Sequence, residues 1–399
     1  MKKVIMCAAA SLLFLLCACS VLSTEGEYQY MRPHTESSSS DVIDQDVIST
    51  YDDLYNAALN IINWRIENDT LLVGNYESDL EQDLEKITQE ITEAYPLGAY
   101  SVSAIVYKQV NILSYTEVTV SVQYKRSIEE LRRVMEVSGT DNLERRLKDD
   151  FSFFRTADVM HISSFTDSEE DWNARVMKCW LNSDMALGLH DWSCVFYPER
   201  RTENILELTV NYTLDSRELA EQKKRIKEAA AEICAGFEGG TAEDKINFVY
   251  GYLHDFVIYD RDVARYVAET GGRQPKTSVY TAYGALAEKY AAQSGMALAA
   301  KVLLAELDVE AMLMEGTRAG LPHYWLYIGD CDGEVRHFDV TAWSELPEPE
   351  APEADGDGEP GEPESDGEAR ADIFSAPYLF NSQYARTNYK WNRKVYGIY

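Results

Sequence analysis

Two side chains able to move a proton, His323 and Asp339, stand in the strand-like runs HYWLYI and RHFDVTAW. Upstream of them, the alanine, leucine and valine spacing of Tyr283–Leu304 predicts a loop that leads into a buried helix. The free backbone N–H groups at such a helix start favour negative charge, as a thiolate nucleophile requires. A nucleophile on that helix, with a histidine and an aspartate on neighbouring strands, is the arrangement used for acyl transfer by a cysteine.

This order of segments resembles the transglutaminase-like family of the papain-like fold. The segments that match its motifs are Tyr283–Leu286, Gly295 with Ala297, His323 with Trp325, and Phe338–Thr341 followed by Trp343. The register has no gap from Tyr283 to Ala297, so the position of the family's catalytic cysteine can be read directly. Gln293 occupies it.

Glutamine has no nucleophilic atom, and a neighbouring base cannot activate its amide. We therefore expect Gln293, His323 and Asp339 to be vestigial triad positions, with the His–Asp pair serving as a structural hydrogen bond. The cleft that the resemblance implies would be lined by Tyr283, Ser294, Gly295 and Trp325.

Another nucleophile could replace the missing cysteine. Ser294 is one position further along the helix and therefore points about 100° away from the matched direction. Cys331 lies in GDCDGEV, which predicts the turn between the two motif strands. A hydrolase or acyltransferase that uses His323 and Asp339 with such a nucleophile remains an alternative, as does a core helix and hairpin without family meaning.

The chain has 399 residues, enough for two or three domains, and a formal net charge of −31. This charge argues against nucleic acid as a partner and against direct adhesion to anionic lipid. It suits a surface-displayed protein or one that meets cationic partners.

Residues 1–18 predict a lipoprotein signal peptide. Lys2 and Lys3 precede the apolar run Val4–Leu16, which is too short to span a bilayer. Leu16–Cys19 resembles a bacterial lipobox, which implies cleavage before Cys19, its acylation, and anchoring outside the cytoplasmic membrane or on an outer membrane. Secretion after ordinary signal-peptide cleavage, without a lipid anchor, is the alternative.

Residues 19–50 are polar and lack periodicity, so we expect a flexible tether.

From residue 51 to residue 237 the order helix, strand, helix, strand, strand occurs twice. We predict two small α/β repeat modules, 51–139 and 140–237, with a helix beginning near Ser127 that opens the second copy. Alternation in Thr116–Tyr124 indicates a sheet with one face covered by helices. These modules lack metal-ligand spacing, a phosphate loop and clustered bases, so spacer and partner surface are the expected roles.

Residues 238–399 form the predicted transglutaminase-like domain, and Thr241 with Asp244 predicts the start of its first helix.

Residues 344–371 are an acidic insertion. Within them, Ser344–Ala369 holds eleven acidic residues and neither lysine nor arginine. Near the cleft mouth it could attract cationic ligands. Its Asp355–Glu359 run suggests a calcium loop, but Pro360 stands where an EF-hand needs glycine. We expect no metal and no cofactor.

Cys179, Cys194, Cys234 and Cys331 remain after processing, and a Cys179–Cys194 disulfide is geometrically possible.

The expected fold class is α+β, with a papain-like C-terminal domain preceded by the two modules. The sequence favours an inactive, membrane-anchored surface lipoprotein that binds a peptide, glycan or envelope partner, or scaffolds one. A purely structural module with a closed cleft is the next hypothesis, and the sequence does not predict the oligomeric state.

Overall fold

The computed structural model describes residues 47–199, 201–270, 277–343 and 377–399. The predicted signal peptide with Cys19, most of the tether and the acidic insertion lie outside these residues. In the part that is described, no helix is both long enough and apolar enough to cross a membrane. The chain is of mixed α and β structure, and residues 47–399 form one unit by their internal contacts.

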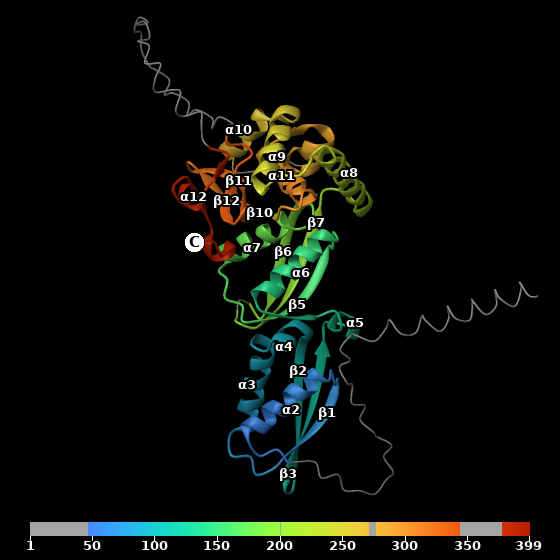
Figure 1. The fold of residues 1–399 in the computed structure, drawn as a ribbon. Coiled ribbons are helices and arrows are strands. Elements are labelled where there is room, and N and C mark those ends of the chain that lie inside the picture. Colours follow the sequence, from blue (N-terminus) through green and yellow to red (C-terminus); the bar gives the residue numbers. More distant parts are fainter. Residues whose placement is uncertain (1–46, 200, 271–276, 344–376) are drawn as a thin grey trace, which may run out of the picture. The chain divides into compact units, whose positions relative to one another are not determined.

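The first sheet is antiparallel with the order β1-β3-β2. Its elements in chain order are α2 (Tyr51–Asn63), β1 (Asn68–Val73), α3 (Leu80–Glu93), α4 (Pro96–Ser101), β2 (Val102–Ile112) and β3 (Tyr115–Tyr124). The alternating valines Val118, Val120 and Val122 are buried in one core with Leu54 of α2 and Ile87 of α3. Both helices therefore cover the same face of this sheet (Figure 1).

The second sheet has the order β4-β5-β7-β6, so its last three strands follow the arrangement of the first sheet. Its elements are α5 (Ile128–Leu131), β4 (Met135–Ser138), α6 (Thr140–Ser152), β5 (Ala157–Ser163), α7 (Glu169–Leu181), β6 (Leu189–Tyr197) and β7 (Asn204–Tyr212). The helix expected from Ser127 does begin there with a capping box. It ends at Leu131, because Met135–Ser138 pairs with β5 as a parallel strand, and α6 is the longer helix that precedes β5.

The third sheet has the order β13-β12-β11-β10-β14. Its strands are β10 (Met312–Arg318), β11 (Leu321–Cys331), β12 (Glu334–Phe338), β13 (Leu379–Phe380) and β14 (Tyr389–Trp391). The surrounding elements are α8 (Ser216–Cys234), α9 (Ala242–Phe256), β8 (Ile258–Tyr259), α10 (Arg261–Thr270), η1 (Ser278–Tyr280), η2 (Gly284–Glu288), β9 (Tyr290–Ala291), α11 (Gln293–Glu306), α12 (Ser382–Asn388) and α13 (Arg393–Tyr396). Thr241 caps α9 and forms a capping box with Asp244, as predicted.

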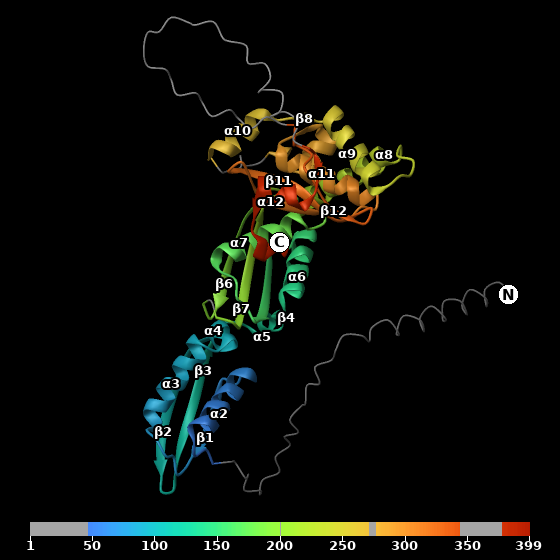
Figure 2. The same ribbon diagram turned by 60° about the vertical axis from the view of Figure 1, so that its left-hand side comes forward.

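Helix α11 is the centre of this part of the chain. Met296, Ala300 and Leu304 have no exposed surface and belong to one continuous core that extends from the second sheet to the third. The helix carries little polar surface on any side because α8, α9 and β11 all pack against it (Figure 2). The residues just before it, expected to be a loop, instead form the π-helical turn η2.

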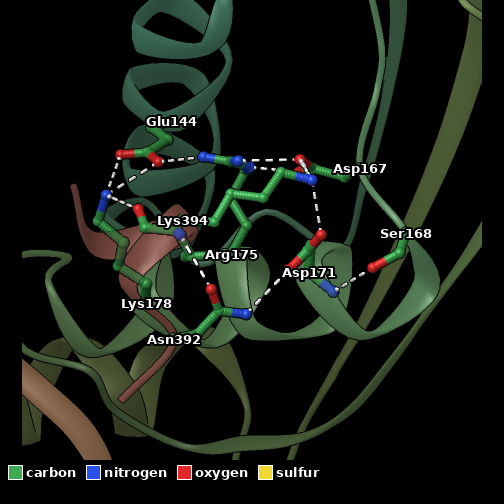
Figure 3. Close-up of polar contacts among 9 residues, drawn as sticks. Glu144, Asp167, Ser168, Asp171, Arg175, Lys178, Asn392 and Lys394 are labelled. Carbon is green, nitrogen blue, oxygen red and sulfur yellow. Dashed lines mark hydrogen bonds and ion pairs between the residues drawn. The ribbon is translucent and has the colours of Figure 1, made fainter.

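A network of charges, buried around Arg175 and exposed at Lys394, joins α6 and α7 to the C-terminal residues (Figure 3). Arg175 forms two hydrogen bonds with Asp167, at 2.5 and 3.0 Å, and one with Glu144 at 2.5 Å. Lys178 donates to Glu144 and to the carbonyl oxygen of Val395, the latter at 2.9 Å. Asp171 accepts hydrogen bonds from Asn392 and Lys394 at 3.0 and 2.6 Å. The network attaches α13 to α7.

Candidate functional site

Gln293 is the first residue of α11, and no side chain caps this helix start. Its amide nitrogen Nε2 lies 2.5 Å from Nδ1 of His323, and its side chain is half-buried. The close approach of α11 and η2 to η1 depends on glycine. A methyl group added at Gly295 would lie 2.2 Å from the carbonyl oxygen of Val279, and one at Gly284 would lie 2.5 Å from that of Ser278.

His323 lies on β11 and connects Gln293 to Asp339, the residue that directly follows β12. Its Nε2 is 2.7 Å from Oδ2 of Asp339, and the imidazole is buried with 2% exposure. An ionised carboxylate only accepts hydrogen bonds, so Nε2 carries the proton that Asp339 binds. Nδ1 then accepts from the amide N–H of Gln293. Each member of this chain of three side chains therefore has a matching donor or acceptor.

Asp339 is fully buried and is surrounded by donors. Oδ2 accepts from Arg318 at 3.3 Å, His323 at 2.7 Å and the hydroxyl of Tyr389 at 2.7 Å. Oδ1 accepts from the backbone and the hydroxyl of Thr341, both at 3.0 Å. Burial by itself would raise the pKa of Asp339, but the hydrogen bonds from His323 and Tyr389 and the charge of Arg318 lower it to about 2. Asp339 is therefore a stable anion.

Arg318 and Tyr389 are site residues that the sequence reasoning missed. Arg318 ends β10 and Tyr389 begins β14, and these two residues are paired across the sheet. Burial and the charge of Asp339 both raise the pKa of Tyr389, so its hydroxyl remains a donor. The signal in the sequence is the aromatic character of the C-terminal residues, a pattern that is more typical of packing than of a polar site.

The four residues assigned to the cleft are not placed alike. Trp325 has no exposed surface, and its indole donates to His337 at 3.1 Å. Ser294 is 3% exposed and Gly295 is buried. Tyr283 is half-buried, and its hydroxyl accepts from Arg225 at 3.2 Å. Three of the four positions thus pack into the interior of the described structure.

The alternative nucleophiles have other partners. The hydroxyl of Ser294 donates to the carbonyl oxygen of Tyr280 at 3.3 Å. Cys331 is buried at the end of β11, and burial raises the pKa of its thiol. Within the described residues neither group forms a hydrogen bond with His323, whose two ring nitrogens face Gln293 and Asp339.

Metal and disulfide chemistry have few candidate groups. Cys179, Cys194, Cys234 and Cys331 all carry free thiols, so the possible Cys179–Cys194 bond is not formed. Across the described ranges, no group of three or more histidine, cysteine, aspartate or glutamate side chains is arranged to hold a metal ion.

Comparison with known proteins gives distant similarity only. No profile of a known family and no curated protein matches the chain. A crystal structure described as a TGase is similar at 12% identity and a TM-score of 0.29, over 59% of this chain and 64% of that one. A candidate protease from Parabacteroides distasonis is similar at 10% identity and a TM-score of 0.20, over 68% of this chain and 39% of that one. The chain spans less than two thirds of either protein.

Proposed function

We propose that residues 238–399 are a transglutaminase-like domain that has lost acyl transfer and serves as a binding or scaffolding module. The observation that carries this proposal is the 2.5 Å contact between the amide nitrogen of Gln293 and Nδ1 of His323. An amide here fills the position from which a thiol would give its proton to the imidazole. The motif resemblance at Tyr283–Leu286, His323 and Phe338–Thr341 supports the family assignment.

An acyl-enzyme needs a nucleophile next to a base that can take its proton. The imidazole of His323 keeps its orientation through Asp339, but its free lone pair is taken up by the amide of Gln293. Because the amide nitrogen is not nucleophilic, the site lacks the first step of the reaction. The remaining polar groups act as a structural connection between α11, β11, β10 and β14.

The burial of the site favours one second candidate, a structural module with a closed cleft. His323 and Asp339 are 2% and 0% exposed, and Met296 and Trp325 beside them are completely buried. A ligand of the triad would have to approach through Gln293, whose side chain keeps partial exposure. Reagents of graded size distinguish the two candidates. If a small alkylator and a bulky maleimide both label Gln293→Cys, the site is open, whereas labelling by the small reagent alone indicates a closed cleft.

The remaining parts of the proposal concern the whole chain. We place the protein on the outer side of the cytoplasmic membrane, or on an outer membrane, held by a lipidated Cys19 and a tether over residues 19–50. Modules 51–139 and 140–237 would then separate the C-terminal domain from the membrane. A peptide, a glycan or another envelope component is the class of partner that this location supplies.

The test of lost catalysis uses the full chain in an assay that measures incorporation of an amine donor and hydrolysis of an activated acyl substrate. We expect no turnover by the natural sequence, by Ser294→Ala or by Cys331→Ser, while an active transglutaminase in parallel gives product. Turnover by the natural sequence that Ser294→Ala or Cys331→Ser removes would establish the alternative enzyme and overturn the proposal.

A further inference from the structure

A cavity of about 1370 Å³ lies on the side of α11 that faces the second sheet. Lys148 of α6, Lys245 of α9 and Lys301 of α11 are among its lining residues. The loop between β11 and β12 and the first turn of α9 complete the wall. None of the triad residues lines this cavity, so it is separate from the site described above.

Lys301 is the most enclosed of the three lysines. Its ammonium donates to the carbonyl oxygens of Leu181 and Ser183, at 3.0 and 2.9 Å, where α7 ends. Burial and the positive charge of Lys148 lower the pKa of Lys301 to about 8, and Asp184 opposes this effect. Lys148 and Lys301 are thus close enough to repel each other, and the direct partners of the Lys301 ammonium are two carbonyl oxygens, with Asp184 acting from a greater distance.

The lack of carboxylate partners distinguishes these lysines from neighbouring cations. Lys178, Arg175 and Lys223 each bind a carboxylate within 2.9 Å. No described carboxylate lies within 4.0 Å of the ammonium groups of Lys148, Lys245 or Lys301. In a chain of net charge −31, three lysines that line one cavity without a direct ion pair to a carboxylate are unexpected.

Four acidic residues also line the cavity, and two of them are already engaged. Asp332 accepts from the backbone N–H groups of Ala242 and Glu243, at 2.9 and 3.1 Å. Asp330 accepts from the backbone of Gly333 at 2.8 Å. The other two, Asp308 and Glu310, are exposed. Asp332 also attracts Lys245, so the half-buried charges of the wall that have no carboxylate of the wall beside them are Lys148 and Lys301.

We propose that this cavity binds a small polyanion whose charges are carried by carboxylate or phosphate oxygens, held by Lys148, Lys301 and Lys245. An anion between Lys148 and Lys301 would relieve their repulsion and satisfy the donors that no carboxylate of the chain reaches. The volume leaves room for an organic body that carries these groups. This binding function is independent of the triad and goes beyond the scaffold role proposed above.

The test is isothermal titration calorimetry of the full chain with citrate, as the carboxylate probe, and pyrophosphate, as the phosphate probe. We expect binding that weakens with added salt. At pH 8, in buffers of different ionisation enthalpy, binding should take up protons, because the bound anion raises the pKa of Lys301. The probe that binds more tightly shows whether the cavity prefers carboxylate or phosphate groups.

Variants decide which residues are responsible. Lys148→Gln, at a half-buried position, should weaken binding by roughly tenfold. Lys301→Met should weaken it similarly and remove the proton uptake. Lys86→Gln, on α3 outside the cavity, is the matched control and should bind as the natural sequence does. The absence of binding to either probe, or equal weakening by Lys86→Gln, would overturn the proposal, as would full binding by Lys148→Gln.

Discussion

At the scale of single residues, the amide of Gln293 holds the imidazole of His323 without giving up its proton. It donates a hydrogen bond to the lone pair of the imidazole of His323, and it does so without forming an ion pair. A cysteine in the same place could give its proton to His323, and the resulting thiolate–imidazolium pair would be costly to desolvate. With glutamine at position 293, the connection between α11 and β11 is neutral.

Asp339→Asn tests the buried anion. We expect it to lower the free energy of unfolding at neutral pH by about 3–5 kcal/mol, because Arg318 loses its buried ionised partner. The pKa of Asp339 is lowered from 3.8 to about 2 in the folded chain, so the anion stabilises the fold above pH 3.8, and this contribution is lost as the pH falls through 2. Urea unfolding over this pH range measures it.

The control for this series is Asp262→Asn, at a side chain that is 95% exposed, which should change little at any pH. The account is contradicted if Asp339→Asn is as stable as the natural sequence at neutral pH. It is also contradicted if the difference between the two persists undiminished as the pH approaches 2.

The sequence could predict part of this site and not the rest. Gln293, His323 and Asp339 lie in segments with recognisable motifs and a fixed register. Arg318 and Tyr389 contact Asp339 from 21 and 50 residues away, and their pairing depends on strand order in the folded sheet. A short-range pattern carries no information about such a neighbour.

At the scale of elements, α11 can approach η1 only because glycine occupies position 295. We expect Gly295→Ala to destabilise the chain by about 3 kcal/mol or more, since the new methyl group would meet the carbonyl oxygen of Val279 at 2.2 Å. Gly251→Ala on α9 is the matched control. It has no atom within 4 Å of the added methyl and should stabilise by about 0.5–1 kcal/mol. Thermal unfolding compares the two, and equal melting temperatures would contradict the packing argument.

Element starts were easier to predict than element ends. Thr241 and Ser127 both begin helices with a capping box, a local signal that involves four consecutive residues. The end of α5 at Leu131 depends on the pairing of Met135–Ser138 with β5, a contact between residues 25 positions apart. The π-helical form of Gly284–Glu288 likewise follows from packing against α8 and α11 rather than from composition.

At the scale of the whole molecule, the second sheet and the C-terminal part share one core. The predicted domain boundary between residues 237 and 238 lies between Ile226 and Ile246, which are both buried in that core. The charge network around Arg175 reinforces the same connection. Residue patterns identify each part separately, whereas the contact between the parts depends on surfaces that form only after folding.

Glu144→Gln tests the network of Figure 3. Glu144 is the carboxylate partner of Lys178 and the second partner of Arg175, which keeps Asp167, so its loss leaves Lys178 without a counter-charge and should cost about 3 kcal/mol in urea unfolding. Hydrogen exchange should also increase at residues 389–399, which the network holds against α7. Glu90→Gln breaks an exposed pair with Lys86 and should cost less than about 0.5 kcal/mol. Unchanged exchange at residues 389–399 would contradict the role assigned to the network.

Cys19→Ser tests the proposed membrane anchor. In a bacterial host it should abolish incorporation of a labelled fatty acid and move the protein from the membrane fraction to the soluble fraction, because a single serine offers no thiol for acylation. Cys17→Ser, two positions earlier in the predicted lipobox, should remain lipidated. If both variants behave alike, Cys19 is not the anchor.

The most direct measurement on the central claim is the pH dependence of alkylation of Gln293→Cys by iodoacetamide. The introduced thiol lies at the start of α11 and beside His323. If position 293 corresponds to the catalytic cysteine of the family, the pKa of this thiol should fall well below the usual value of about 8.5. Adding His323→Ala should restore an ordinary pKa and slow the reaction near neutral pH. A thiol with an ordinary pKa, reacting equally with and without His323, would contradict the claim.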